Sequence, residues 1–175
     1  NIGSVFHMTK AALPWLMKTR GNIVSAGSES GKIGLENNAV FGGTKGFIHA
    51  FMRGVAIEYG RHGVRANCVC PGPVDTAMTH KETGPMTDEM EAHLTAATVF
   101  GRRGTVEEIA NVYAFLASEE ASYVTGALWL VDGATTILKG SVGEKAGRAA
   151  RMQPEVTLPV HHTHEGMAHK NYEKH

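Results

Sequence analysis

Two short apolar runs and a helical pattern between them decide the fold: Ile23-Val24-Ser25-Ala26-Gly27-Ser28, Val64-Arg65-Ala66-Asn67-Cys68-Val69-Cys70, and residues 39–60. Each apolar run predicts a short buried strand, and Pro71-Gly72-Pro73 ends the second one. Residues 39–60 predict a long helix because Phe47, Phe51 and Val55 fall on one stripe. A strand, a helix and a strand with short connections form a right-handed βαβ unit, so the two strands should be parallel.

Further elements extend this unit on both sides. Residues 2–18 predict a helix that Pro14 should kink or shorten. Thr105-Val106-Glu107-Glu108 has the spacing of a capping box and predicts the start of another helix, and residues 127–131 predict a third strand. Strands that alternate with helices indicate the α/β fold class.

Two segments lack such periodicity. Residues 77–100 are interpreted as a mobile flap over the site, because they spread apolar and polar residues without a pattern: Met78, His80, Gly84-Pro85, Met86, Met90 and His93. Residues 138–175 are interpreted as a C-terminal tail rich in glycine, alanine, charge and histidine.

Composition restricts the class of protein. The 175 residues are 42% hydrophobic, enough for one domain with a real core, and the formal charge of +0 predicts neither a nucleic-acid nor a membrane partner. No apolar run reaches the ~18 residues that span a bilayer. Cys68 and Cys70 lie two apart in a strand, so their side chains point the same way. We interpret them as reduced and buried, in a cytoplasmic protein.

The candidate site lies between the first strand and the long helix. Ser28 ends the strand, at the edge where open α/β sheets bind ligands. Lys45 follows near the start of the helix, and Phe41, four residues earlier, shares its helical face. The pattern predicts a hydroxyl, an aromatic ring and an ammonium around one small volume. The alternative to a functional site is that all three residues are structural: a serine that ends a strand, a solvated lysine and a phenylalanine that packs in the core.

Several spaced motifs together resemble the short-chain dehydrogenase/reductase family. They are Asn1 at a helix start, Ile23-Val24 before Ser28, the Phe41-to-Lys45 spacing, Asn67 through Pro71-Gly72, Val74, Thr76, and Tyr123-Val124-Thr125-Gly126 before Val131-Asp132-Gly133. The resemblance covers residues 1–137 and implies the C-terminal portion of a Rossmann-like, doubly wound parallel sheet.

The resemblance also implies roles for individual residues. Asn1 would hold a water of the proton relay, Ser28 would hydrogen-bond the substrate oxygen, and Lys45 would bind the nicotinamide ribose. The loop that holds the nicotinamide end would consist of Pro71, Gly72, Val74 and Thr76. The implied cofactor is NAD or NADP, and no metal is implied. The family's glycine-rich phosphate loop lies upstream of the Asn and has no match here, so the choice between the two cofactors cannot be read.

The implied reaction is hydride transfer between the nicotinamide and a small-molecule secondary alcohol or ketone. Phe41 stands where the family has its acid–base Tyr, and a phenyl ring has no proton to give. Loss of a positioned general acid typically costs ~10²–10⁴ in rate, so we expect impaired activity. The alternatives are a non-catalytic homologue that binds nucleotide or partner subunits, and a recent lesion in a once-active gene. The substrate stays open.

The ends of the chain carry the remaining expectations. The chain starts at Asn1 without Met, so we expect a fragment of a protein that forms a homo-oligomer at full length. Residues 1–175 alone should not form a stable monomer, because the strand ending at Ser28 would present an open apolar edge. The tail holds His161, His162, His164, His169 and His175, which predict either a metal site or, in preference, a tail that is partly disordered or covers a neighbour's site.

Overall fold

The three strands form one parallel sheet in the order β1-β2-β3. The computed structural model describes residues 1–77, 79, 87–140, 143–152 and 154. Strand β1 (Asn22–Ala26) pairs with β2 (Arg65–Pro71), and β2 pairs with β3 (Leu128–Val131). The parallel βαβ unit and the third strand are therefore confirmed.

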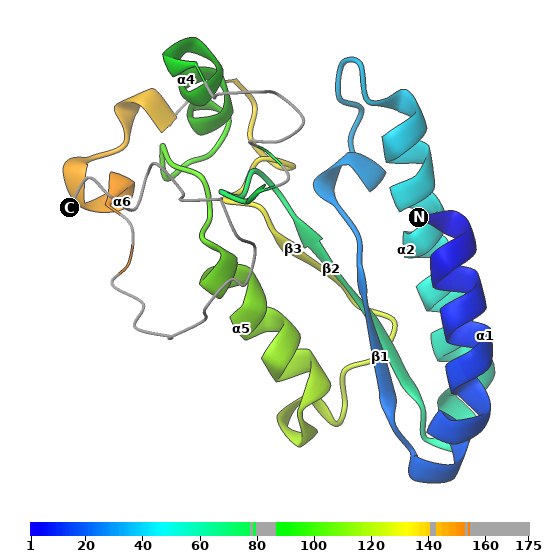
Figure 1. Ribbon diagram of the computed structural model, residues 1–175. Coiled ribbons are helices and arrows are strands. Elements are labelled where there is room, and N and C mark those ends of the chain that lie inside the picture. The colour runs from blue at the N-terminus through cyan, green and yellow to red at the C-terminus, as the bar shows by residue number, and fades with distance from the viewer. Residues whose placement is uncertain (78, 80–86, 141–142, 153, 155–175) are drawn as a thin grey trace.

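Helices cover both faces of this sheet. Helices α1 (Ile2–Thr19) and α2 (Ala39–Tyr59) lie on one side, and α5 (Val106–Ala117) lies on the other (Figure 1). The side chains of β2 alternate accordingly: Cys68 and Cys70 join the core under α2, whereas Val69 packs against α5. This is the doubly wound α/β arrangement predicted from the sequence.

The edge strand β1 and the central strand β2 differ in burial. Five consecutive residues of β2 are buried, whereas β1 has one buried residue, Ser25, because β1 pairs only with β2 among the described residues. Helix α1 continues past Pro14 to Thr19, and the kink expected at Pro14 stays a prediction. The capping box of α5 is confirmed, with Thr105 and Glu108 hydrogen-bonded to each other's backbone N–H.

The predicted C-terminal ends of β1 and β2 were wrong. β1 ends at Ala26 rather than Ser28, because the Gly27 N–H makes a last ladder-like hydrogen bond to the Val69 carbonyl and the chain then turns. Ser28 instead caps a short 3₁₀ helix, η1 (Glu29–Gly31). β2 includes Pro71, which pairs with Val131 at the strand's last position, where its missing N–H costs no central ladder bond.

Part of the segment 77–100, which was interpreted as a mobile flap, forms a helix; the mobility of the segment stays a prediction. Thr87 caps a helix, α4 (Asp88–Ala96). The side-chain oxygen of Thr87 accepts a hydrogen bond from the Met90 N–H. Met78, His80, Gly84-Pro85 and Met86 lie outside the described residues. The start of the tail is also ordered, with η4 (Gly143–Lys145) packed on α4 and a short α6 (Arg148–Arg151). The five tail histidines lie outside the described residues. Among the described helices, none is long and apolar enough to cross a membrane.

Candidate active site

A cavity of about 450 Å³ opens at the carboxyl ends of β1 and β2. It brings together most of the residues that the sequence singled out: Ser28, Phe41, Lys45, Pro71, Gly72, Val74 and Thr76. Gly27 and Thr79 also line the cavity. Helix α5 contributes four further lining residues: Val106, Ile109, Ala110 and Tyr113. Parallel strands place their carboxyl ends at one sheet edge, so segments far apart in sequence meet there.

Ser28 is held by the turn that follows β1. Its Oγ accepts a hydrogen bond from the Ser30 N–H at 3.2 Å and another from the Ser30 hydroxyl at 2.8 Å. The turn lies close to α2 because Gly42 has no side chain, and a Cβ there would stand 2.7 Å from the Ser30 carbonyl oxygen. Both contacts use the Ser28 oxygen as acceptor, so its own O–H remains a donor that neither contact uses.

Lys45 reaches the cavity from the first turns of α2. It is buried, and its Nζ donates to the Ala26 carbonyl oxygen at 2.9 Å. Nζ also lies 5.4 Å from the centroid of the Phe41 ring. Burial lowers the pKa of Lys45, and the nearby Cys68 and Cys70 partly oppose this effect. The ammonium has three N–H donors, and the bond to Ala26 uses one of them.

The cavity contains a phenol, but not in the place of Phe41. Tyr113 projects from α5, and burial raises its pKa to about 12. A phenol with so high a pKa gives up its proton less readily than a free tyrosine. Phe41 stands beside Lys45 with 37% of its surface exposed and has no proton to offer. The sequence predicted this helix from its capping box, and no local pattern could have shown that Tyr113 lines a cavity.

Asn1 lies apart from this group. It precedes α1, and its Nδ2 donates to the Thr44 Oγ1 at 2.9 Å. With Phe41 and Thr44, it lines a neighbouring cavity rather than the one that contains Ser28 and Lys45. Asn1, Ser28, Phe41 and Lys45 were the four positions predicted to act in catalysis. Three of them, Ser28, Phe41 and Lys45, line one cavity, and Asn1 does not.

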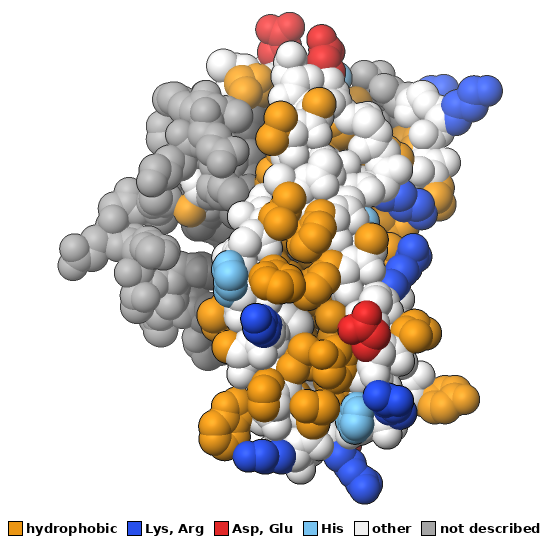
Figure 2. Space-filling model, turned by 90° about the vertical axis from the view of Figure 1, so that its right-hand side faces the viewer, with side chains coloured by type: hydrophobic (Ala, Val, Ile, Leu, Met, Phe, Trp, Pro, Cys, Tyr) orange, Lys and Arg blue, Asp and Glu red, His pale blue; other side chains and the backbone are white. Residues whose placement is uncertain are grey.

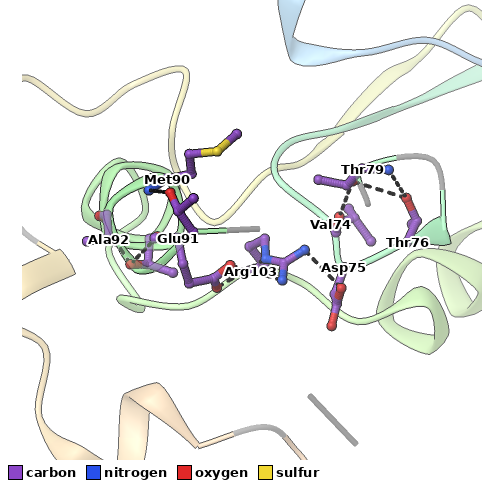
Figure 3. A network of polar contacts seen from close by, with 10 residues as sticks. Val74, Asp75, Thr76, Thr79, Met90, Glu91, Ala92 and Arg103 are labelled. Atoms are coloured by element: carbon purple, nitrogen blue, oxygen red, sulfur yellow. Dashed lines mark hydrogen bonds and ion pairs between the residues drawn. The ribbon is translucent and has the colours of Figure 1, made fainter. Parts of the chain in front are cut away.

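The loop after β2 is held by a buried ion-pair network that the sequence did not reveal. Arg103 donates to Asp75 at 2.9 Å and contacts both carboxylate oxygens of Glu91, at 3.1 and 3.0 Å (Figure 3). The side chains of Arg103 and Asp75 are 1% and 3% exposed. A backbone bridge between Val74 and Gly104 joins the same two segments. Arg103 thus positions the loop from Pro71 to Thr76, although adjacent arginines in a sequence usually indicate a solvated surface.

Glu29 is the second buried acidic group near the site. It directly follows Ser28 and is 8% exposed, and its Oε2 has no hydrogen-bond partner among the described residues. Burial raises the pKa of Glu29 to about 7, with a smaller contribution from Asp132. A glutamate after a strand usually points into solvent, so only the packing of η1 on α2 places this carboxyl inside the protein.

Comparison with known proteins identifies relatives over most of the chain. The profile of a family described as enoyl-(acyl carrier protein) reductase matches residues 1–136. A meso-2,3-butanediol dehydrogenase from Serratia marcescens is 39% identical over 140 residues, which are 80% of this chain and 54% of the relative. The 3-oxoacyl-[acyl-carrier-protein] reductase FabG of Escherichia coli is 37% identical over 134 residues, 76% of this chain and 53% of FabG. A third relative, from Xanthobacter autotrophicus, is named inactive 2-(S)-hydroxypropyl-CoM dehydrogenase 2 and is 39% identical over 141 residues, 79% of this chain and 61% of its own length.

Solved structures agree with the sequence matches. The Cj0485 dehydrogenase superposes with a TM-score of 0.75 at 30% identity, covering 79% of this chain and 55% of that one. A gluconate 5-dehydrogenase from Burkholderia cenocepacia, solved with NADP and tartrate, gives 0.72 at 25% identity, covering 77% and 52%. The chain thus spans between 53% and 61% of the three relatives named above. Its motifs, its sheet and these matches make it a member of the short-chain dehydrogenase/reductase family.

Proposed function

We propose that this chain belongs to an oxidoreductase that uses NAD or NADP to interconvert a secondary alcohol and a ketone, at a rate that Phe41 limits. The observation that carries the proposal is the shared cavity. Ser28, Lys45 and the loop after β2 all line it, and the partly exposed Phe41 lines it beside Lys45. The family, and a structural neighbour solved with NADP, support a nicotinamide cofactor.

The lining residues fit such a cofactor. Lys45 offers two N–H donors beyond its bond to Ala26, which suit the hydroxyls of a ribose. Pro71, Gly72, Val74 and Thr76 form a mainly apolar wall with one hydroxyl, which suits a flat ring with a polar edge. A bound nicotinamide would supply the exchange of hydride with a carbonyl carbon. Ser28, with its O–H free of both contacts to Ser30, would donate to the oxygen on that carbon.

The missing proton donor sets the expected rate. Phe41 has no acidic proton, and burial holds the pKa of Tyr113 at about 12. Among the groups that line the cavity, Lys45 carries a proton whose pKa is lowered by burial. Lys45 would also hold the cofactor and donates to the Ala26 carbonyl oxygen, so it is poorly placed to protonate the substrate oxygen. We therefore expect turnover that is slow but measurable.

Phe41→Tyr tests the proposal. A phenol at this position, with its ionised form stabilised by the Lys45 ammonium 5.4 Å from the present ring, should raise kcat by ~10²–10⁴. The measurement is steady-state turnover of a panel of secondary alcohols with NAD and with NADP. Phe41→Leu is the matched control, since it changes the ring without adding a proton. A gain below ~10-fold for the tyrosine variant would contradict the assigned role of this position.

A non-catalytic nucleotide-binding homologue is the second candidate. Phe41 favours it, as does the existence of a relative whose name calls it inactive. Fluorescence titration with NADH and NADPH separates the two candidates when Lys45→Met serves as the binding-deficient control. Saturable binding together with no gain in the tyrosine variant would favour the second candidate. Absence of saturation with either nucleotide would contradict both.

We also propose that the protein assembles with further copies of itself through α1 and α2. Figure 2 shows hydrophobic side chains gathered along this side of the molecule. The two helices expose large apolar residues, namely Ile2, Phe6, Met8, Trp15, Val40 and Ile57. Monomers rarely leave so much apolar surface uncovered. Size-exclusion chromatography with light scattering should give a mass above that of one chain, and a monodisperse monomer would refute the assembly.

A further inference from the structure

A buried group of two thiols and one imidazole lies next to the cavity but outside its lining. Cys68 and Cys70 project from β2 and His49 projects from α2, and all three are buried. The Cys70 Sγ lies 3.2 Å from the His49 Nε2 and 4.0 Å from the Cys68 Sγ. The three potential donor atoms all lie within 4.8 Å of one another. The proposed oxidoreduction uses none of them.

These separations suit a single soft metal ion. A tetrahedral zinc with bonds of about 2.3 Å to sulfur and about 2.0 Å to nitrogen holds its ligands roughly 3.5–3.8 Å apart. The observed 3.2 and 4.0 Å lie on either side of that range. Thiolate and imidazole ligands favour zinc and monovalent copper over the hard cations magnesium and calcium. A thiol–imidazole hydrogen bond involves Cys70 and His49 alone, whereas the alternation of side chains along β2 brings a third donor, Cys68, to the same side of the sheet.

Gly27 packs directly against the group. A Cβ at this position would stand 2.7 Å from the Cys68 Sγ, 2.7 Å from the His49 Nε2 and 2.8 Å from the Cys70 Sγ. These distances are too short for a real Cβ, so any side chain here would push the donor atoms out of their present positions. The lack of a side chain at position 27 therefore lets the two thiols and the imidazole lie this close together.

The group can also be reached from solvent. His49 and Cys70 line a separate cavity of about 490 Å³, which offers an entry path and space for a water as fourth ligand. A backbone hydrogen bond with Gly31 helps to orient the His49 ring.

We propose that Cys68, Cys70 and His49 bind one thiophilic metal ion, Zn²⁺ or Cu⁺, and that Gly27 allows these three ligands to lie close together. Two S–H bonds break and two sulfur–metal bonds form, so the two thiol protons pass to solvent as the ion binds. With Zn²⁺ the two thiolates balance the ion's charge, which burial favours. The ion would join β2 to α2 directly behind Gly27 and Lys45, and so stiffen the wall that carries the proposed chemistry.

Cobalt substitution tests the site with the metal alone. The reduced full chain is titrated with Co²⁺ under nitrogen, followed by Zn²⁺ or Cu⁺ as competitors. A thiolate-to-cobalt charge-transfer band in the near ultraviolet should saturate at one Co²⁺ per chain. The chain has 2 cysteines among its 175 residues, so this band cannot come from the tail histidines. Displacement of cobalt by Zn²⁺ or by Cu⁺ tells which ion the site prefers. Absence of the band in the reduced, folded chain would overturn the proposal.

Four variants locate the site. Cys70→Ser and His49→Ala each remove a ligand and should weaken Co²⁺ binding by more than ~10-fold, since even partners of ligands contribute that much. Gly27→Ala keeps every ligand but pushes the donor atoms out of their present positions, and should abolish the band. His62→Ala is the matched control at an exposed histidine and should change nothing. Circular dichroism confirms folding, and a variant that fails to fold leaves the others to decide. An unchanged band in folded Cys70→Ser or His49→Ala would refute the assignment.

Discussion

The cavity has two polar walls that are held in place by different forces. On the α2 wall, single hydrogen bonds position Ser28 and Lys45, and glycines let η1 approach the helix. On the loop wall, the buried Arg103 holds the segment from Pro71 to Thr76 through Asp75, and ties it to α4 through Glu91 (Figure 3). One wall carries the groups that we propose to take part in the reaction, and the other carries the ion pairs that hold the backbone.

The difference teaches where a substitution should alter chemistry and where it should alter stability. A hydrogen bond such as Lys45 to Ala26 typically contributes about 0.5–1.5 kcal/mol. Removing one partner of a buried ion pair costs about 3–5 kcal/mol, because the other charge stays buried without compensation. The α2 wall therefore tolerates changes such as Phe41→Tyr, whereas the loop wall should lose much of its stability when a single charge is removed.

The largest expected effect on stability is that of Arg103→Met. The variant removes the cation that pairs with the buried Asp75, whose side chain is 3% exposed, and should lower the free energy of unfolding by about 3–5 kcal/mol. Urea denaturation followed by circular dichroism measures the loss. The matched control is Arg102→Met, since Arg102 pairs with Glu108 at 2.7 Å but both side chains are more exposed, at 14% and 30%. That variant should cost about 1 kcal/mol. Equal losses in the two variants would abolish the distinction between the walls.

Glu29→Gln, on the α2 wall, should raise the free energy of unfolding, by less than Arg103→Met lowers it. Folding raises the pKa of Glu29 from 4.5 to about 7, so the folded state binds its proton more tightly than the unfolded state. The wild type should therefore lose stability as the pH rises from about 4.5 to about 7, and the cost is fully present above pH 7. Glutamine removes the charge, so the variant should be more stable than the wild type by about 2 kcal/mol at pH 8, after allowance for partial solvent screening.

Paired denaturation curves at pH 4.5 and pH 8 check this sign. At the lower pH Glu29 is largely neutral in the folded protein, so the variant and the wild type should have similar stabilities. A variant that is less stable than the wild type at pH 8 would mean that the carboxylate makes a favourable contact on this wall. The α2 wall would then resemble the loop wall in depending on charge for its stability.

Local pattern was sufficient for the elements that position the site. The apolar runs that contain Ile23 and Val69 became β1 and β2, the stripe of Phe47, Phe51 and Val55 became part of α2, and Thr105 caps α5 as its spacing predicts. These predictions succeeded because strand alternation, helical periodicity and capping depend on residues within a few positions of one another. The connection order then required the strands to be parallel and placed Ser28, Lys45 and the Pro71 loop at one edge.

The same reasoning failed where a residue's partner is distant in sequence. Arg103 meets Asp75 across 28 positions, and Cys70 meets His49 across 21. Residues 88–96 contain few apolar residues, yet α4 forms because Thr87 caps it and Glu91 anchors it to Arg103. Asn1 lies beside Thr44 instead of Lys45, which no local pattern specified.

The sequence by itself determined the α/β class, the parallel order of the strands and the identity of the groups around the cavity, including the absence of a phenol at position 41. Each of these depends on backbone periodicity or on covalent residue identity. Only the tertiary structure decided the burial of Glu29, the ion pairs of Arg103 and the convergence of two thiols and an imidazole on Gly27. Burial and convergence arise when distant segments pack, because packing removes water and brings side chains within a few ångströms of each other.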